Sequence, residues 1–502
     1  MREQTVNVLT FHGDNARLGW NAKETLLTPE SVVPETFGKL WETPLDAVVN
    51  SSPLTKDGVI FAATNLNSVY ALRGTDGKIL WVTKNISPTL TGGQFNGDWR
   101  NKERNGILST PVIDSAMGAI YVCLPRARGL RQTYEVWALD IRTGKPLLGW
   151  PVTLDGSYKN ARFTPGQLMQ RGALLIHDGW LYIPFGGRGD VPPWRGWVMG
   201  VNLKQPKQKQ RCFCASTSTD GAGIWSAGGL SVSKEGEFFA VTGNGDYDFP
   251  QGDNLAQTVL RLRADAKNGL VFSRQTRDFY TPENHLFLDE QDEDLGGATA
   301  LVLPRLPGTS TPNVIFTGGK DGCAYLLNRD NLGGVGRELQ KERLFTDPKA
   351  TYHEGIRATC AYFDAGPAGR FLFVPGDNPG PDKNLGLVAL KLAPEKPGGP
   401  LRFSKVWTLP KQLNRPSSPV VSSNGASAGL VWVFEPEGDD GQQSVLHVYD
   451  ALTGKETYHS ELNPKQDRLS GGRKFVSATV ANGRVFIGVK GVACYGRKDT
   501  NS

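Results

Sequence analysis

The stretch SSPLTKDGVIFAATNLNSVYALRGTDGKILW (Ser51–Trp81) contains the pattern that decides the fold. It begins with two serines, continues with an apolar strand after Asp-Gly, and reaches a second strand, VYALR, that is followed by a Gly-Lys turn. Apolar and polar residues alternate along these segments, which is typical of short β-strands joined by tight turns. The stretch therefore predicts one antiparallel unit of up to four strands.

Similar units recur along the whole chain. The eight copies span approximately residues 51–81, 109–150, 170–213, 226–275, 296–345, 357–408, 417–460 and 475–496. A repeat of this length, built from four short strands, is the signature of a β-propeller, in which each copy forms one blade. We therefore predict an all-β fold, with residues 1–502 forming a single eight-bladed propeller domain.

The last copy lacks one strand. It ends at Tyr495-Gly496 without the outer strand that other copies have, and an unassigned strand, FGKLWETPL (Phe37–Leu45), precedes the first copy. Pairing the two would close the ring and remove the open sheet edges. We expect residues 37–45 to complete the eighth blade.

The composition excludes two classes of partner. The chain of 502 residues is 39% hydrophobic and 21% charged, and it has no apolar run long enough to form a transmembrane segment. The net charge of +6 is spread thinly, and its one basic cluster, Lys204–Arg211, reads as a solvated loop. Nucleic-acid binding is therefore not expected.

The cysteines and the N-terminus bear on the compartment. Six cysteines are scattered without zinc-ligand spacing, mostly within apolar strands, and we expect buried thiols. The N-terminal sequence MREQTVNVL has no hydrophobic segment of signal-peptide length. The chain is thus expected to be either cytoplasmic or a mature form whose leader has been removed.

Two kinds of segment are expected to surround the propeller axis: the insertions and the first residues of each copy. The insertions at residues 87–108, 151–169, 279–295 and 340–356 are expected to form a rim over one face. The first strand of each blade lines the axis, where the small hydroxylic residues either leave room for a ligand or allow close blade packing. Arg171 and Arg357 occupy the same position, and an axial guanidinium needs an anionic partner, either a ligand carboxylate or Asp190.

The polar loop VTGNGDYDFPQGDN (Val241–Asn254) follows an apolar strand. It carries three carboxylates and two asparagine amides that are able to offer oxygen atoms to one cation or one ligand. A lone indole, Trp225, lies in the small-residue setting GAGIWSAGG, and an acidic run (Asp289–Asp294) follows downstream. The order of these pieces suggests one composite site.

These motifs resemble those of the pyrroloquinoline quinone (PQQ) dehydrogenases and the wider PQQ-like propeller family. That family has, in order, a tryptophan under the quinone, a TGN turn, a GDN turn, a catalytic Asp in an acidic segment, and a basic residue before a strand. The similar positions here are Trp225, Thr242-Gly243-Asn244, Gly252-Asp253-Asn254, Asp292 or Asp294, and Lys320 in KDGCAYLLNR.

The resemblance implies a specific chemistry. Asn244, Asp190 and Asp294 would hold Ca²⁺ next to PQQ, and Asp294 or Asp292 would act as general base on an alcohol or sugar hydroxyl. Trp225 would carry the quinone ring, Lys320 would hold the quinone oxygens, and Arg171 and Arg357 would bind the cofactor. PQQ-type propellers work outside the cytoplasm, which implies a periplasmic or secreted protein.

Other features favour an alternative without catalysis. The adjacent cysteine pair of many such dehydrogenases is absent, and there is no Cys-x-x-Cys-His haem motif. The N-terminal FHGDNARLGWN (Phe11–Asn21) resembles the opening of PQQ-like propellers of no assigned chemistry, which are related in fold to the propeller lipoprotein of the outer-membrane assembly machinery. The alternative is a scaffold propeller that binds a protein partner or a glycan on its face.

Overall fold

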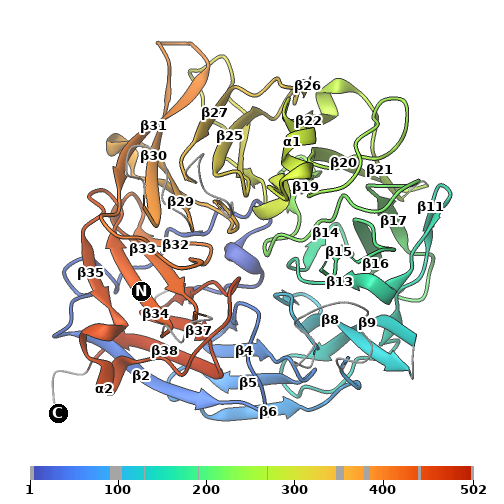
Figure 1. Ribbon diagram of the computed structural model, residues 1–502. Coiled ribbons are helices and arrows are strands. Elements are labelled where there is room, and N and C mark those ends of the chain that lie inside the picture. The colour runs from blue at the N-terminus through green and yellow to red at the C-terminus, as the bar shows by residue number, and fades with distance from the viewer. Residues whose placement is uncertain are drawn as a thin grey trace.

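The computed structural model describes residues 5–90, 105–128, 131–189, 191–267, 269–345, 355–377, 385–438 and 443–498. Within these residues eight antiparallel sheets stand around a central axis (Figure 1). Two short α-helices occur in the same ranges, α1 (His285–Glu290) and α2 (Pro464–Asp467). The prediction of an eight-bladed, all-β propeller is confirmed.

Blades 1 to 4 follow one another along the chain. Their strands are β3 (Leu54–Lys56), β4 (Val59–Ala63), β5 (Val69–Arg73) and β6 (Ile79–Thr83) in blade 1; β7 (Val112–Asp114), β8 (Ala119–Arg128), β9 (Arg131–Asp140) and β10 (Val152–Thr153) in blade 2; β14 (Leu175–His177), β15 (Trp180–Gly187), β16 (Trp197–Asn202) and β17 (Arg211–Cys214) in blade 3; and β18 (Ser231–Val232), β19 (Glu237–Val241), β20 (Val259–Asp265) and β21 (Gly269–Val271) in blade 4. Smaller additions are β13 (Leu168–Met169) beside β15, β22 (Phe279–Thr281) beside β20, and the hairpin β11 (Ser157–Tyr158) and β12 (Ala161–Arg162).

Blades 5 to 8 complete the ring. Their strands are β23 (Leu301–Val302), β24 (Val314–Gly318), β25 (Cys323–Asn328) and β27 (Gln340–Arg343) in blade 5; β28 (Ala361–Asp364), β29 (Arg370–Pro375), β30 (Leu387–Pro394) and β31 (Leu401–Thr408) in blade 6; β32 (Val420–Asn424), β33 (Ser427–Glu435), β34 (Val445–Asp450) and β35 (Glu456–His459) in blade 7; and β36 (Thr479–Ala481), β37 (Arg484–Gly488), β38 (Gly491–Arg497) and β2 (Phe37–Pro44) in blade 8. Two short strands pair in parallel at the edges: β1 (Trp20–Asn21) with β32, and β26 (Gly334–Val335) with β22.

Two-residue turns explain why the inner strands form hairpins. Asp57-Gly58 joins β3 to β4, and both residues have positive φ, at 52° and 78°. Asn482-Gly483 joins β36 to β37 in the same way, with φ of 56° and 73°. Such turns match the right-handed twist of the two strands, and Asp-Gly and Asn-Gly adopt them most readily.

Tryptophans of outer strands connect successive blades. Trp81 at the end of blade 1 lies against Gly144 in the turn of blade 2, and its indole Nε1 donates to the carbonyl of Ile141 at 3.0 Å. A Cβ on Gly144 would lie 2.5 Å from the Trp81 ring, and the residue has a φ of 71°, so glycine is required there. The same arrangement joins Trp41 to Gly77 and Trp407 to Gly454.

The ring is closed by β2, as predicted. This strand pairs with β38 from Phe37↔Arg497 to Pro44↔Gly491, so a strand from the N-terminal part of the chain completes the last blade. Phe37 is fully buried and packs against Trp432, Tyr458 and Tyr495. The pairing covers the edge of β38 that would otherwise be unpaired, and β2 becomes the outer strand of blade 8.

The small residues at the start of each blade form hydrogen bonds between blades. The backbone N–H of Ser52 donates to Thr110 Oγ1 at 3.1 Å, and the N–H of Ser477 donates to Ser52 Oγ at 3.0 Å. On the other side of the ring, Ser226 and Thr299 share a hydrogen bond of 2.7 Å between their hydroxyls. These hydroxyls hold neighbouring blades together, which favours the close-packing reading of the sequence.

A segment before β2 crosses the axis and contacts blade after blade. Its backbone bonds join Val8 to Thr55, Leu9 to Ile113, Asn15 to Val232, Ala16 to Val302, Leu18 to Tyr362, and Gly19 to Val421. The 3-10 turn η1 (Phe11–Gly13) lies in the middle of the ring, where the chain is blue in Figure 1. Arg17 is fully buried beside it, and its guanidinium donates to the carbonyls of Phe11, Leu174 and Leu230. This segment covers one end of the axis.

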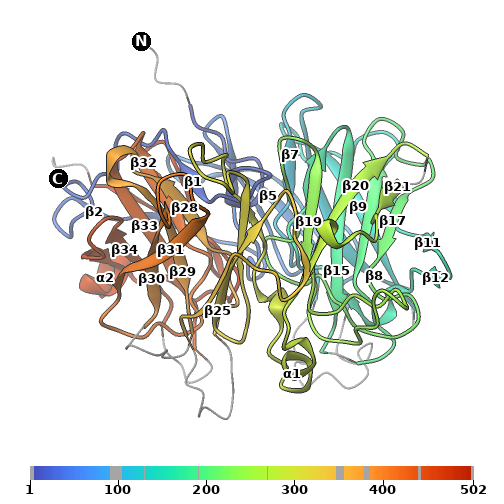
Figure 2. The ribbon, with the colours of Figure 1, turned by 90° about the horizontal axis from the view of Figure 1, so that it is seen from above.

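The two ends of the axis therefore differ. Figure 2 shows β1 in the upper half of the ring and α1 at its lower edge, on the opposite face. Helix α1 belongs to the expected insertion at residues 279–295. No helix within the described ranges is long and apolar enough to cross a membrane. The candidate site lies toward the α1 end.

Candidate functional site

Trp225 lies where blade 3 passes into blade 4, between β17 and β18. A Cβ on Gly186 would lie 2.8 Å from the Cβ of Trp225, so this glycine lets the strand β15 approach the tryptophan closely. A Cβ on Gly243 would lie 2.8 Å from the indole Nε1 and 3.0 Å from Asp294 Oδ1. The glycine of the TGN turn thus brings the indole and the carboxylate to one place.

Asp294 follows α1 and is 5% exposed. Its Oδ1 accepts a hydrogen bond of 2.6 Å from the backbone N–H of Asn244. In the next residue of the turn, the N–H of Gly245 donates to Asp289 Oδ1 at 2.5 Å. Two carboxylates of the acidic run therefore bind successive amides of the TGN turn, which fixes that turn against the acidic segment.

Lys320 lies in the turn between β24 and β25 and is 7% exposed. Its Nζ is 2.8 Å from Asp292 Oδ1 and 3.4 Å from Asp294 Oδ2, and its backbone N–H donates to the Asp294 carbonyl at 2.8 Å. The Asp292 side chain is 56% exposed, whereas that of Asp294 is 6% exposed. The lysine thus binds one solvent-facing and one buried carboxylate.

Burial and neighbouring charges perturb the acidic run. Burial raises the pKa of Asp289 above its ordinary value, the bond from Gly245 opposes that change, and the nearby carboxylates of Asp246, Asp292 and Glu290 add to it. A carboxylate crowded by others holds a proton more readily. Asp289 is therefore the carboxyl of this run whose proton affinity is raised.

Arg171 covers the face of the indole. Its Cζ is 5.0 Å from the centroid of the Trp225 ring and 4.3 Å from that of Phe475, and its Nε donates to the Trp225 carbonyl at 3.1 Å. A guanidinium between two aromatic rings is held by cation–π attraction. Phe475 itself has a φ of 76°, which is unusual for a residue other than glycine.

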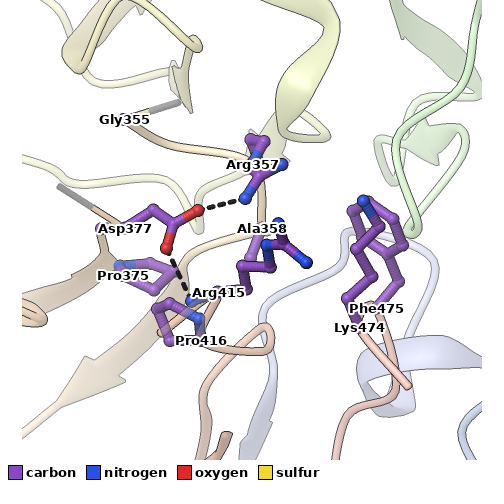
Figure 3. Close-up of a pocket in the computed structure, with 10 residues that line it drawn as sticks. Gly355, Arg357, Ala358, Pro375, Asp377, Arg415, Pro416, Lys474 and Phe475 are labelled. Carbon is purple, nitrogen blue, oxygen red and sulfur yellow. Dashed lines mark hydrogen bonds and ion pairs between the residues drawn. The ribbon is translucent and has the colours of Figure 1, made fainter. Parts of the chain in front are cut away.

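A small cavity near Phe475 is lined by further cationic side chains. Figure 3 shows Arg357 and Arg415 on the side of Asp377, with Lys474 and Phe475 across from them. Asp377 forms an ion pair with Arg357, and it accepts a hydrogen bond of 2.6 Å from the backbone N–H of Arg415. The cavity measures about 10 Å³, which is room for about one water molecule.

The structure brings together Trp225, Asn244, Asp292, Asp294 and Lys320, which come from two blades and the segment between them. Of the two predicted axial arginines, Arg171 lies on Trp225, whereas Arg357 is paired with Asp377 in blade 6. Asp190, predicted as a calcium ligand, lies outside the described residues.

The GDN turn does not join this set. Asp253 Oδ2 is 2.7 Å from Lys159 Nζ, and its other oxygen is paired with Arg274. Asn254 donates from its backbone and its side chain to the carboxylate of Asp248, at 2.9 and 2.7 Å. The carboxylates of Asp248 and Asp253, two of the groups expected to offer oxygens to one cation or one ligand, therefore bind protein groups instead.

Sequence reasoning missed Phe475, Asp377, Arg415 and Lys474. They lie in loops of the last three blades that match no motif, and nothing in their local sequence distinguishes them. Within the part of the chain that the structure describes, no group of three or more His, Cys, Asp or Glu is arranged to hold a metal ion.

All six cysteines belong to the described residues. They are buried and form no disulfide. Burial raises the pKa of the Cys212 thiol to about 11 and that of the Cys214 thiol to about 12. A thiol with a raised pKa and no access to solvent is unreactive, which agrees with the expected buried strand thiols.

Two groups of known proteins similar to this chain bear on its function. Residues 33–97 match the family described as "Outer membrane protein assembly factor BamB". The outer membrane protein assembly factor BamB of Nitrosomonas eutropha (strain DSM 101675 / C91 / Nm57) is 26% identical over 120 residues. Those residues make up 24% of this chain and 24% of that protein, so the match spans about a quarter of the relative's length.

The second group consists of solved structures. The quinohemoprotein alcohol dehydrogenase ADHIIG from Pseudomonas putida HK5 has a TM-score of 0.68 at 15% identity, covering 99% of this chain and 81% of that one. A europium-containing methanol dehydrogenase has a TM-score of 0.63 at 15% identity, covering 96% and 89%. The chain has the eight-bladed PQQ-like propeller fold, and the resemblance inferred from the sequence is confirmed at this level.

Proposed function

We propose that this protein is a quinoprotein dehydrogenase that binds PQQ and Ca²⁺ beside Trp225 and oxidises an alcohol or a sugar. The observation that carries the proposal is the convergence of Trp225, Asn244, Asp294 and Lys320 in the order and setting that the sequence resemblance implies. Trp225 touches the TGN turn, that turn binds Asp294, and Asp294 is paired with Lys320.

The donor set fits the chemistry of the two groups. The amide of Asn244 and the carboxylate of Asp294 supply the oxygen ligands that Ca²⁺ prefers. The carboxylates of PQQ require cations, and Arg171, Arg357 and Lys474 lie near the same end of the axis. Because Arg171 covers the indole, its side chain must leave that face before a planar ring can lie there. Its guanidinium then becomes available to a carboxylate of the cofactor.

Each residue has a defined task in this proposal. PQQ, when bound, supplies the acceptor for the hydride that leaves the substrate carbon. Asp294 accepts the proton of the substrate hydroxyl, since it is the buried carboxylate of the set. Lys320 balances the charge of Asp294 before the proton arrives, and the N–H of Asn244 fixes the orientation of that carboxylate.

The test uses purified full-length protein. PQQ and Ca²⁺ are added, the absorbance of the quinone reports binding, and reduction of a redox dye reports turnover with a panel of alcohols and sugars. Asp294→Asn is expected to abolish turnover and to leave quinone binding within about tenfold. Asp330→Asn, an exposed change in blade 5, serves as the matched control. Absence of quinone binding at micromolar concentration would overturn the proposal.

A second candidate function is supported by the other group of relatives. The BamB family match covers β2 and all four strands of blade 1, and the BamB relative is an outer membrane protein assembly factor. In this candidate the propeller binds a protein partner through one face, and the stack of Arg171 on Trp225 is a permanent structural contact. Quinone binding that is absent in both the native protein and an Arg171→Ala variant would favour this candidate.

Both candidates place the protein outside the cytoplasm, in the periplasm or secreted. The support is the similarity of residues 33–97 and of a 120-residue stretch to outer membrane protein assembly factors. Fractionation of the native cells, followed by detection with a specific antibody, tests this placement. Recovery with cytoplasmic markers would contradict it.

A further inference from the structure

A second cavity lies on the other side of the TGN turn from Trp225. It measures about 290 Å³ and lies between the loop that follows β19 and the helix α1. Its lining includes Asp246, Tyr247 and Gln257 from the loop, and His285 and Asp289 from α1. Nothing in the proposed quinone chemistry uses this cavity.

Gln257 provides the sharpest indication of a ligand. The residue is 1% exposed, its side-chain Oε1 accepts the N–H of Leu295 at 2.8 Å, and its backbone N–H donates to the Gly243 carbonyl at 2.9 Å. Its side-chain Nε2 has no acceptor among the described residues. A buried amide donor without an acceptor is unfavourable, so an oxygen atom in the cavity would satisfy it.

The charged side chains of the lining restrict the class of ligand that could supply the oxygen for Gln257. The lining contains the carboxylates of Asp246, Asp248 and Asp289 and contains no lysine or arginine, so an anionic ligand is repelled. A bare cation is also unsuitable, because it cannot accept a hydrogen bond from Gln257. The described residues of the cavity form no group arranged to hold a metal.

An aromatic surface completes the site. The rings of Tyr247 and His285 lie 4.6 Å apart between centroids, at an angle of 58°, and both residues are partly exposed at the cavity. Aromatic rings supply a large, rigid contact area for the apolar face of a ligand. The cavity thus combines acceptors, a buried donor and an aromatic wall.

We propose that this cavity binds a polyhydroxylated ligand, a sugar or a polyol. A neutral hydroxyl group both donates and accepts hydrogen bonds, so the hydroxyls of such a ligand donate to Asp246 and Asp289 and accept from Gln257 Nε2. The C–H face of the same ligand packs on Tyr247. Binding at this site requires no cofactor and is independent of the proposed quinone.

The cavity also adjoins the site described above. Gly243 in the TGN turn and Gly245 directly after it bind Gln257 and Asp289, which line the cavity, and Asn244 between them binds Asp294. If the protein is the proposed quinoprotein dehydrogenase, the adjacent cavity indicates that its substrate is a sugar or a polyol. That part of the inference rests on the proposed function, whereas ligand binding itself does not.

The test measures binding to the full-length protein by titration calorimetry and saturation-transfer NMR, without PQQ. The probes are neutral hexoses, disaccharides and linear polyols, with gluconate and 1-butanol as an anionic and a monohydroxylic comparison. At least one neutral probe is expected to bind at millimolar concentration or tighter. Gluconate is expected to bind more weakly than glucose, and 1-butanol is expected not to bind.

Variants identify the cavity as the binding place. Gln257→Glu keeps an oxygen for Leu295 and removes the donor, and Tyr247→Ala removes the aromatic wall; each is expected to weaken binding at least about fivefold. Asp246→Asn changes an exposed position, so it provides a second variant that should fold as the native protein does. Glu290→Gln, on α1 next to Asp289 but outside the lining, is the matched control and should bind as the native protein does.

Three outcomes would overturn the inference. They are the absence of binding by every neutral probe, equal binding of 1-butanol and the polyols, and unchanged affinity in correctly folded Asp246→Asn and Tyr247→Ala variants. Thermal melts and circular dichroism check the folding of each variant. Failure of quinone binding alone leaves this inference unaffected, so the two proposals are tested separately.

Discussion

At the scale of single residues, Lys320 compensates the negative charge of two carboxylates in the acidic run. Without this lysine the carboxylates of Asp292 and Asp294 would repel each other beside the turn that holds Asn244. Of the pair, Asp294 is the one that is buried and oriented by a backbone N–H, which is why our proposal assigns the general base to Asp294 and not to Asp292. The sequence left these two residues as alternatives.

A second charged cluster lies in blade 7. His447 is buried, with Nε2 3.0 Å from Glu435 Oε2 and Nδ1 2.8 Å from Glu456 Oε1. Lys411 Nζ is also 2.8 Å from Glu456 Oε1. Burial raises the pKa of Glu456, but the bonds from His447 and Lys411 outweigh it and lower the pKa to about 2. The carboxylate is therefore more stable in the folded protein than in the unfolded chain.

This cluster gives a prediction on pH. Because the folded pKa of Glu456 lies below the unfolded value, its stabilisation is fully present above about pH 5 and is lost as the pH falls from about 4.5 to 2. Glu456→Gln is expected to lower the free energy of unfolding by about 1–2 kcal/mol at pH 7, allowing for partial exposure. Thermal unfolding between about pH 3 and 7 measures the difference, which should shrink toward acid.

The matched control is Glu395→Gln. Glu395 is 59% exposed and lies 3.8 Å from Arg402, so its replacement should change stability little at any pH. A difference between native protein and Glu456→Gln that persists unchanged at about pH 3 would contradict the electrostatic explanation.

At the scale of elements, β2 is the strand on which ring closure depends. Its Phe37 contacts aromatic rings of both blade 7 and blade 8, so it joins the last two blades as well as completing one. Leu40 on the same strand is 36% exposed. Burial of an aromatic ring between blades therefore stabilises closure in addition to the backbone hydrogen bonds of β2.

Phe37→Ala is predicted to destabilise the protein by about 3–4 kcal/mol, because it removes a fully buried ring and leaves a cavity. Leu40→Ala, in the same strand, is predicted to cost less than about 1 kcal/mol. Denaturant unfolding followed by tryptophan fluorescence compares the two variants. Equal effects would show that closure depends on the backbone pairing of β2 and not on the ring of Phe37.

At the scale of the whole molecule, the segment before β2 crosses the ring and connects the inner strands of several blades. It binds the inner strands of successive blades with backbone hydrogen bonds and places Arg17 in the interior. Burial lowers the pKa of the Arg17 guanidinium to about 10, so the group remains charged at neutral pH. Its hydrogen bonds to three backbone carbonyls compensate for the loss of hydration.

Deletion of residues 1–24 tests this role. The deletion keeps β2, so the ring should stay closed while the inner strands lose partners. We expect a lower thermal midpoint and faster hydrogen exchange in β7, β23 and β32, with β38 still protected. Hydrogen exchange read by mass spectrometry resolves these strands. Unchanged exchange in β7, β23 and β32 would refute the role, as would equal loss of protection in β38.

The sequence alone determined the architecture of this protein. Repeated strand patterns, Asp-Gly and Asn-Gly turns and an unassigned strand at Phe37–Leu45 are local signals, so eight blades and their closure could be predicted. The order of Trp225, Asn244, Asp294 and Lys320 could also be read, because these residues lie in short motifs beside strands. Local chemistry and repetition sufficed for both results.

Only the tertiary structure decided what surrounds those motifs. Arg171 lies on Trp225, where Phe475 from the last part of the chain presents a second ring to the guanidinium. Asp253 turns away from the site because Lys159 and Arg274 attract it. Gln257 lines a cavity through its contacts with Gly243 and Leu295. Such partners are separated along the chain and meet only when the ring closes, so no local pattern encodes them.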